Sequence, residues 1–170
     1  MNPIKLLAVS LLISGFASTG FCTETKTIAY PTVDSPSFEI TVPATWELTP
    51  AEEPDGFFHL ESPTGALFSF RTIEGTNESL KAAVEESIEE ISKQFDDVKL
   101  GDAEDWTPNG LSGFYATGEG KDKEGKAVRI GMGWCVLTNG KIVDLWFVSD
   151  LSDEKGMNQA SEIANSLKAP

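Results

Sequence analysis

Few side chains in this sequence could perform chemistry: one histidine, two cysteines and 27 acidic residues. No cysteine and no second histidine stands at metal-ligand spacing from His59, so a transition-metal site is not expected. We interpret His59 as an ordinary strand residue that is half exposed. A contribution of His59 to a binding surface is the alternative interpretation.

Acidic residues crowd the stretch from residue 96 to residue 105, and hard cations such as calcium prefer several carboxylates. The spacing of an EF-hand loop is missing, however, and residues that alternate along a strand point to opposite faces. An acid/base pair would need two carboxylates roughly 5–9 Å apart, a separation that the sequence does not define. We therefore predict no metal site and no catalytic residue in this cluster. Its members are Asp96, Asp97, Asp102, Glu104 and Asp105.

Signatures of nucleophilic and phosphate-binding chemistry are also missing from the sequence. It contains no Gly-x-Ser-x-Gly elbow, which excludes that class of serine hydrolase. The Gly131-Met132-Gly133 stretch lies inside an expected strand, and no Gly-Lys-Ser or Gly-Lys-Thr follows it, so phosphate-cradling loops of those types are excluded. We predict that the protein is not an enzyme and that it carries no cofactor.

The first 22 residues have the pattern of a cleaved secretory signal peptide. Lys5 precedes a short apolar run from Leu6 to Ile13, and small residues follow. This run is within the ~7–15 residues of a signal core and below the ~18 needed to span a membrane. We predict export to the periplasm or the extracellular space, and a mature chain that begins near Thr23 and has no transmembrane segment. A lipid anchor on Cys22, which would hold the protein at a membrane, is the alternative.

Net charge narrows the range of partners. Removing the signal takes away one of the 13 basic residues and none of the 27 acidic ones, so the net charge moves from −14 to about −15. Such a charge repels nucleic acid and anionic lipid headgroups, and it favours a basic protein, a cation or a neutral ligand. The alternative is that the acidity only keeps an exported protein soluble.

The elements that position these residues follow from the apolar pattern. A polar stretch with two prolines, residues 23–36, is expected to be a flexible tether before a single domain, residues 37–170. Alternating apolar residues predict an antiparallel sheet of about seven strands, with hairpin signals in the Asn-Gly pairs at 109–110 and 139–140. The predicted strands cover residues 38–42, 57–60, 66–73, 98–106, 111–119, 126–137 and 141–149.

Two helices complete the predicted order βββ-α-ββββ-α. The first helix is expected over residues 77–95, where apolar residues recur at helical spacing and acidic residues fall mostly on the other face. Thr76 or Asn77 would cap its N-terminus. The second helix is expected over residues 153–168. The buried stripe predicted for the first helix consists of Leu80, Val84, Ile88, Ile91 and Phe95.

A two-residue turn at Asn139-Gly140 would set the register of the last hairpin. In that register Trp146 lies opposite Gly133, and an indole over a glycine leaves a shallow apolar floor that receives either more structure or a partner. Asp144 would lie opposite Cys135 and raise the pKa of its thiol, so we interpret Cys135 as a small buried residue. The predicted partner-binding residues are Phe114, Gly131, Gly133, Asp144 and Trp146.

The segment Phe38-Glu-Ile-Thr-Val-Pro43-Ala-Thr-Trp46, together with the order of elements, resembles the PsbP-like superfamily, which includes PsbP and DcrB-like exported bacterial proteins. The strand followed by Pro-x-x-Trp is the specific part of this resemblance. The remainder, to about Lys168, matches in element order only. The resemblance implies an antiparallel sheet flanked by helices and a non-enzymatic role as an accessory or docking protein. It implies no catalytic residues for this chain.

These observations lead to one functional hypothesis and two alternatives. The hypothesis is an exported, non-catalytic binding protein that docks on a protein or complex of the cell envelope through an apolar and aromatic patch framed by acidic residues. The first alternative is a carrier of a small ligand or of a cation such as calcium in the envelope. An enzyme is the third possibility, and a deep pocket that holds His59 or two close carboxylates would favour it.

Overall fold

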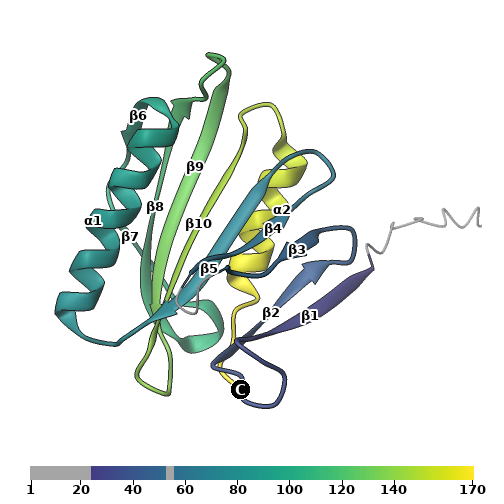
Figure 1. The fold of residues 1–170 in the computed structure, drawn as a ribbon, viewed down its shortest axis with the longest axis vertical. Helices are drawn as coiled ribbons and strands as arrows, with labels where there is room; N and C mark the ends of the chain where they lie inside the picture. The colour runs from purple at the N-terminus through teal and green to yellow at the C-terminus, as the bar shows by residue number, and fades with distance from the viewer. Residues whose placement is uncertain (1–23, 53–55) are drawn as a thin grey trace, which may run out of the picture.

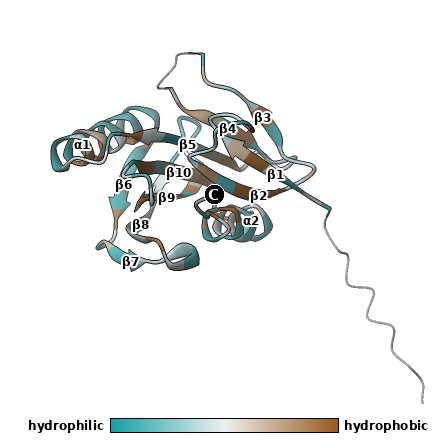
Figure 2. Cartoon of the chain, turned by 90° about the horizontal axis from the view of Figure 1, so that it is seen from below, coloured by the Kyte–Doolittle hydropathy of each residue, from teal (hydrophilic) through white to brown (hydrophobic). Residues whose placement is uncertain are grey.

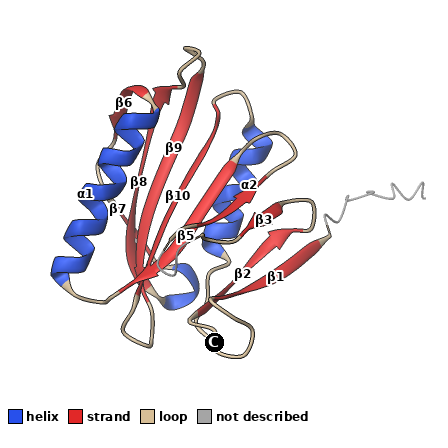
Figure 3. Ribbon diagram, viewed as in Figure 1, coloured by secondary structure: helices blue, strands red, loops and turns tan. Residues whose placement is uncertain are grey.

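A computed structural model of the chain describes residues 24–52 and 56–170 (Figure 1). The predicted signal peptide, residues 1–22, and its cleavage point lie outside the described residues. The described chain forms an antiparallel sheet of eight strands, a two-stranded sheet and two α-helices (Figures 1 and 3). The predicted α+β class and antiparallel sheet are confirmed, and the strand count is higher than the seven expected.

The main sheet is antiparallel throughout. Its strands are β3 (Glu47–Thr49), β4 (Phe58–Glu61), β5 (Leu67–Ile73), β6 (Asp96–Leu100), β7 (Glu104–Trp106), β8 (Ser112–Lys121), β9 (Ala127–Val136) and β10 (Ile142–Asp150). The neighbours follow the order β3-β4-β5-β10-β9-β8-β6, and β7 also pairs with β8. The chain therefore leaves the sheet after β5 and re-enters it at the far edge with β6. Residues 98–106, predicted as one strand, are divided between β6 and β7.

A second sheet pairs β1 (Thr25–Tyr30) with β2 (Phe38–Pro43) in antiparallel register, and Tyr30 lies opposite Phe38. Residues 25–30 of the predicted flexible tether therefore form a paired strand. Two exposed threonines alternate with Lys26 and Ile28, and Ala29 and Tyr30 are both partly or fully buried, so the apolar alternation of β1 is too weak to recognise in the sequence. Packing against the rest of the molecule decides whether such a segment forms a strand.

The helix between β5 and β6, α1 (Asn77–Gln94), agrees with the prediction in position. Its N-terminus is capped by the hydroxyl of Thr76, which accepts a hydrogen bond from the backbone N–H of Ser79 at 3.0 Å. The predicted buried stripe is partly wrong, because Ile88 is 42% exposed and Ala83 is buried instead. The helix is turned so that its small residues approach the sheet.

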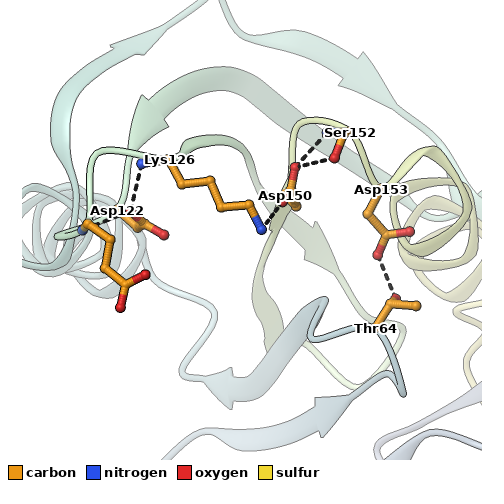
Figure 4. Close-up of polar contacts among 7 residues, drawn as sticks. Thr64, Asp122, Lys126, Asp150, Ser152 and Asp153 are labelled. Carbon is orange, nitrogen blue, oxygen red and sulfur yellow. Dashed lines mark hydrogen bonds and ion pairs between the residues drawn. The ribbon is translucent and has the colours of Figure 1, made fainter.

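The second helix, α2 (Glu154–Asn165), begins after Asp153, whose carboxylate accepts a hydrogen bond from the N–H of Gly156 at 2.9 Å. The hydroxyl of Thr64, in the turn between β4 and β5, donates to the same carboxylate at 2.6 Å (Figure 4). Figure 4 also shows the ion pair of Lys126 with Asp150 beside it. The contact of Thr64 joins the start of α2 to the β4–β5 turn, and the ion pair of Lys126 joins the chain just before β9 to the end of β10.

The two helices lie on opposite faces of the main sheet (Figure 2). We call them the α1 face and the α2 face, and β1 and β2 lie with α2 on the second of these. Side chains alternate along β9 between the two faces, so two apolar clusters form. Met132 and Trp134 belong to the cluster under α1, whereas Cys135 belongs to the cluster under α2.

The two Asn-Gly pairs form different turns. Asn109 and Gly110, between β7 and β8, both have positive φ angles of 47° and 82°, as a two-residue hairpin turn requires. In the last hairpin only Gly140 has a positive φ, and the N–H of Leu137 donates to the carbonyl of Lys141. The loop therefore contains three residues, and the register predicted from a two-residue turn is wrong by one position.

Candidate functional site

The observed register separates the five predicted partner-binding residues onto the two faces of the sheet. Trp146 lies opposite Met132 and Asp144 opposite Trp134, so both belong to the α1 face, as does Phe114. Gly133 lies opposite Leu145 and Gly131 opposite Phe147, on the α2 face. The expected indole over a glycine is thus absent from this hairpin, and the five residues do not form one surface.

The glycine floor itself exists on the α2 face. A Cβ added to Gly131 would overlap the ring of Phe147, and a Cβ on Gly133 would stand 3.5 Å from Trp106 and from Leu145. The missing side chains leave room above β9. This room is closed on one side by α2, whose residues Ser161 and Asn165 face it.

A cavity of about 320 Å³ lies above this floor. A second hollow of about 420 Å³ shares Thr117, Phe147 and Ser161 with it. We call the two together the α2 groove. The residues around its first part are Trp106, Tyr115, Thr117, Met132, Gly133, Leu145, Phe147, Ser161, Ala164 and Asn165. The residues around its second part are Thr117, Gly118, Glu119, Arg129, Phe147, Met157, Asn158 and Ser161.

Hydrogen bonds hold the aromatic walls of the α2 groove in place. The indole N–H of Trp106 donates to Oδ1 of Asn165 at 3.0 Å, which joins β7 to α2. The hydroxyl of Tyr115 donates to Glu104 at 2.8 Å, and this hydrogen bond raises the pKa of the phenol. Two walls are therefore fixed by polar contacts at their outer ends, while their apolar surfaces face the cavity.

Asp144, on the α1 face, is the charged residue among the five predicted partner-binding residues, and it has no exposed surface. Its Oδ2 accepts a hydrogen bond from Nε of Arg71 at 2.9 Å, and Arg71 also pairs with Glu86 of α1 at 2.8 Å. Burial raises the pKa of Asp144 to about 6, and the charge of Arg71 opposes that rise. The three residues clamp α1 to the sheet.

The structure places the other candidate residues apart from one another. His59 is half-buried on β4, its Nδ1 lies 2.8 Å from Oγ of Ser69, and burial lowers its pKa. Cys135 lies opposite Val143 rather than Asp144, so the predicted cause of its raised thiol pKa is wrong. Burial raises that pKa to about 11, which makes the thiol a poor nucleophile.

Three members of the acidic cluster at residues 96–105, namely Asp96, Asp97 and Glu104, form ion pairs or hydrogen bonds. Asp96 pairs with Lys123 and Asp97 with Lys121, each at 2.8 Å. Within residues 24–52 and 56–170 no three acidic, cysteine or histidine side chains are grouped as a metal site would need. No helix in the same ranges is long and apolar enough to cross a membrane.

Comparisons with known proteins place the fold. No known protein family and no curated protein matches the sequence. Among solved structures, cyanobacterial PsbP (CyanoP) from Synechocystis sp. PCC 6803 superposes with a TM-score of 0.55 at 14% identity, over 92% of this chain and 99% of that protein. The chain has the PsbP-like fold. The resemblance inferred from the first strand and the order of elements is therefore confirmed at the level of the fold.

Two further structures share the PsbP-like fold. The Ran-binding protein Mog1p of Saccharomyces cerevisiae has a TM-score of 0.56 at 16% identity, over 86% of this chain and 96% of Mog1p. A protein of Bacteroides thetaiotaomicron has a TM-score of 0.56 at 15% identity, and 85% of this chain spans 48% of that longer protein. Identities this low establish a shared PsbP-like fold and carry no functional residue across.

Sequence reasoning missed most of the α2 groove. Trp106, Tyr115 and Phe147 were expected only as strand residues, because nothing in their spacing shows that three strands and a helix bring them together. The two glycines of β9 were the one available signal. They predict a floor that exists, but three of the residues predicted to share it, Phe114, Asp144 and Trp146, lie on the opposite face of the sheet.

Proposed function

We propose that this chain is an exported, non-catalytic accessory protein that docks on a protein of the cell envelope. The α2 groove carries the proposal, because it is a concave apolar surface whose aromatic walls are fixed before any partner arrives. Preformed aromatic pockets are where binding energy concentrates in protein interfaces. The signal-like N-terminus supports the exported location.

The proposed occupant is a segment of an envelope protein that inserts an apolar or aromatic side chain into the α2 groove and carries a basic residue beside it. Glu104 stands behind Tyr115, and Glu119 lies along the second part of the groove. The net charge of −14 favours a basic partner over an acidic one. Two proteins with the PsbP-like fold support a binding role by analogy, since one is a PsbP and the other is described as Ran-binding.

The test compares two tryptophan substitutions on α2. Ser161→Trp fills the α2 groove from an exposed helix position, while Glu162→Trp places the same side chain on the neighbouring exposed position, which is not a groove residue. The tagged mature chain and both variants are crosslinked gently in their own envelope fraction, and bound proteins are identified by mass spectrometry. A protein captured in stoichiometric amount is then purified and titrated directly against each variant.

The expected result is one envelope protein that binds the parent chain and the Glu162→Trp variant and loses at least about tenfold in affinity with Ser161→Trp. Equal binding by both variants would show that the α2 groove is not the docking site. No capture at low or moderate salt, with both variants folded, would count against the docking function itself.

A cavity of 320 Å³ also favours a second candidate, a carrier of a small apolar ligand, since this volume is at the lower end for small-molecule sites. A ligand that binds only the folded state raises the melting temperature, and this rise grows with the logarithm of the ligand concentration above Kd. Extraction of the purified protein with organic solvent, followed by mass spectrometry, would reveal a retained molecule. Its loss in the Ser161→Trp variant would assign it to the α2 groove.

A further inference from the structure

A separate cavity of about 220 Å³ lies on the α1 face, between α1 and the aromatic residues Phe57 and Trp146. It shares no residue with the α2 groove, which lies on the opposite face of the sheet. We call it the α1 pocket. Its residues are Phe57, Glu86, Ser87, Glu90, Ile91, Gln94 and Trp146.

The α1 pocket has an apolar floor and an acidic mouth. Trp146 is 8% exposed and Ile91 is 2% exposed, so the floor is nearly closed to solvent. Glu86 and Glu90 are both exposed residues of α1 that line the pocket. A molecule that enters the α1 pocket would therefore pass the carboxylates first and then contact the aromatic side chains.

The aromatic walls are arranged in a way that attracts cations. The rings of Phe57 and Trp146 meet edge to face, with centroids 6.4 Å apart and an angle of 74° between their planes. The guanidinium carbon of Arg71 already stands over the Phe57 ring, 4.3 Å from its centroid. The negative electrostatic face of an aromatic ring stabilises such a charge, and tryptophan does so most strongly.

The charge around the α1 pocket is negative even with Arg71 counted. Asp144 and Glu86 both pair with this guanidinium, so its positive charge is already compensated. Glu90 adds a further carboxylate at the mouth, where its Oε1 accepts a hydrogen bond from the amide of Gln94 at 2.8 Å. Two carboxylates thus pair with one guanidinium and Glu90 adds a third negative charge at the mouth, so an additional cation would be attracted rather than repelled.

A polar atom in the floor lacks a partner. The hydroxyl oxygen of Ser87 is buried, its residue is 5% exposed, and no described atom forms a hydrogen bond with it. An unpaired buried hydroxyl is unfavourable, and a bound polar group would satisfy it. Ser87 lines the α1 pocket, so the polar group that pairs with its hydroxyl would come from the molecule bound there.

We propose that the α1 pocket binds a small organic ammonium ion, with its alkylated nitrogen against Phe57 and Trp146 and a polar substituent near Ser87. Calcium or magnesium fits poorly, because these ions need six or more oxygen ligands and the floor offers one hydroxyl. A neutral apolar guest would gain nothing from Glu86 and Glu90. Aromatic rings combined with nearby carboxylates are the surroundings that alkylammonium groups favour. The proposal is independent of docking at the α2 groove.

The test titrates choline chloride into the purified full chain by calorimetry and follows tryptophan fluorescence in parallel. The matched probe is 3,3-dimethylbutan-1-ol, which has the shape of choline but replaces the charged nitrogen with carbon. Sodium chloride at equal ionic strength controls for screening. We expect saturable binding of choline, a rise in melting temperature with its concentration, and at least tenfold weaker binding of the neutral probe.

Three variants assign the binding to the α1 pocket. Glu90→Gln removes a charge from the mouth, and Phe57→Leu removes one aromatic face while keeping an apolar side chain. Each is expected to weaken choline binding by roughly three- to tenfold. Glu89→Gln is the control, because Glu89 is an exposed residue of the same helix that pairs with Lys93 and is not a pocket residue.

Three results would overturn the proposal. They are no saturable binding of choline by the folded chain, equal binding of choline and its neutral analogue, and an equal loss of binding in Glu89→Gln and Glu90→Gln. The Ser161→Trp variant of the α2 groove should bind choline unchanged. Failure of docking at the α2 groove and failure of ammonium binding at the α1 pocket are therefore separate outcomes.

Discussion

Two aspartates on the same strand have pKa values shifted in opposite directions. Asp144 is buried, and the loss of hydration raises its pKa to about 6. Asp150 accepts hydrogen bonds from Lys126 and Ser152 at the exposed end of β10, and these lower its pKa to about 2. Burial outweighs a single guanidinium at Asp144, whereas hydrogen bonds to the charged form prevail where water remains.

The raised pKa of Asp144 predicts a specific pH dependence of stability. Between about pH 4 and pH 6 the folded state holds a proton that the unfolded state has released, so this residue's contribution falls as the pH rises. A shift of about two units corresponds to at most about 3 kcal/mol. The free energies of unfolding of the parent chain and of Asp144→Asn, measured in urea, should therefore differ by an amount that changes between about pH 4 and pH 6.

Asp150→Asn is the matched control for that experiment. Because the pKa of Asp150 is lowered, its contribution is present above about pH 4 and is lost as the pH falls towards 2. The difference between the parent chain and Asp150→Asn should thus be constant from pH 4 to pH 6. Parallel profiles of the parent chain and Asp144→Asn would show that Asp144 titrates normally.

The two glycines of β9 should respond differently to alanine. A Cβ at Gly131 overlaps the ring of Phe147, so Gly131→Ala should lower the free energy of unfolding by about 1–3 kcal/mol. At Gly133 the nearest atoms stand 3.5 Å from the added Cβ, which is ordinary contact, and Gly133→Ala should be neutral or slightly stabilising. Chemical denaturation of both variants measures the difference.

A double-mutant cycle identifies the cause at Gly131. In a Phe147→Ala background the ring is gone, so the added cost of Gly131→Ala should fall close to zero. An unchanged cost in that background would mean that the backbone of β9, and not the Phe147 ring, requires glycine there.

At the scale of elements, the start of α2 depends on the carboxylate of Asp153, which accepts two hydrogen bonds. Asp153 caps the helix through Gly156 and accepts a hydrogen bond from Thr64 of the β4–β5 turn. Asp153→Ala should lower the free energy of unfolding by about 0.5–2 kcal/mol, as the loss of a cap does. Asp153→Asn keeps a capping oxygen and should lose less, which thermal unfolding can measure.

Thr64→Val separates the contributions of the two hydrogen bonds that Asp153 accepts. It removes the hydroxyl that reaches from the turn and leaves the cap intact, so its cost should be below that of Asp153→Ala. In the Asp153→Ala background, Thr64→Val should cost less than it does alone, because the acceptor is already missing. Full additivity of the two changes would argue against a link between the turn and α2.

At the scale of the whole molecule, β1 and β2 cover part of the core on the α2 face. Tyr30 at the end of β1 is 3% exposed, and its ring centroid lies 5.1 Å from that of Phe38, 5.0 Å from Phe58 and 5.6 Å from Phe70. The residues expected to form a tether therefore supply an aromatic side chain to the centre of the fold.

Tyr30→Ala should consequently lower the free energy of unfolding by about 3–5 kcal/mol, as large-to-small changes at buried aromatic residues do. Val33→Ala, three residues further along and 83% exposed, should leave it unchanged within about 0.5 kcal/mol. Removal of all residues before Ser37 should cost at least as much as Tyr30→Ala. A shortened chain with the parent melting temperature would restore the tether interpretation.

The sequence alone determined the two helices, most strands of the main sheet and their antiparallel arrangement, while β1 and β3 were not recognisable in it. Helix α1, its cap at Thr76, the β4–β5 hairpin and the turn at Asn109-Gly110 all follow from side chains a few residues apart. Such local signals can be recognised without knowledge of the fold, because they depend on backbone conformation and on the spacing of apolar residues. The PsbP-like fold was recognisable from the same local order.

Only the tertiary structure decided which residues share a face. Asn139-Gly140 is compatible with a two-residue and with a three-residue turn, and these differ by one position in register. Because side chains alternate along a strand, that single position moves Trp146 from the glycine floor to the opposite face of the sheet. The α2 groove and the α1 pocket both join strands to a helix distant in sequence, and only long-range packing brings such residues together.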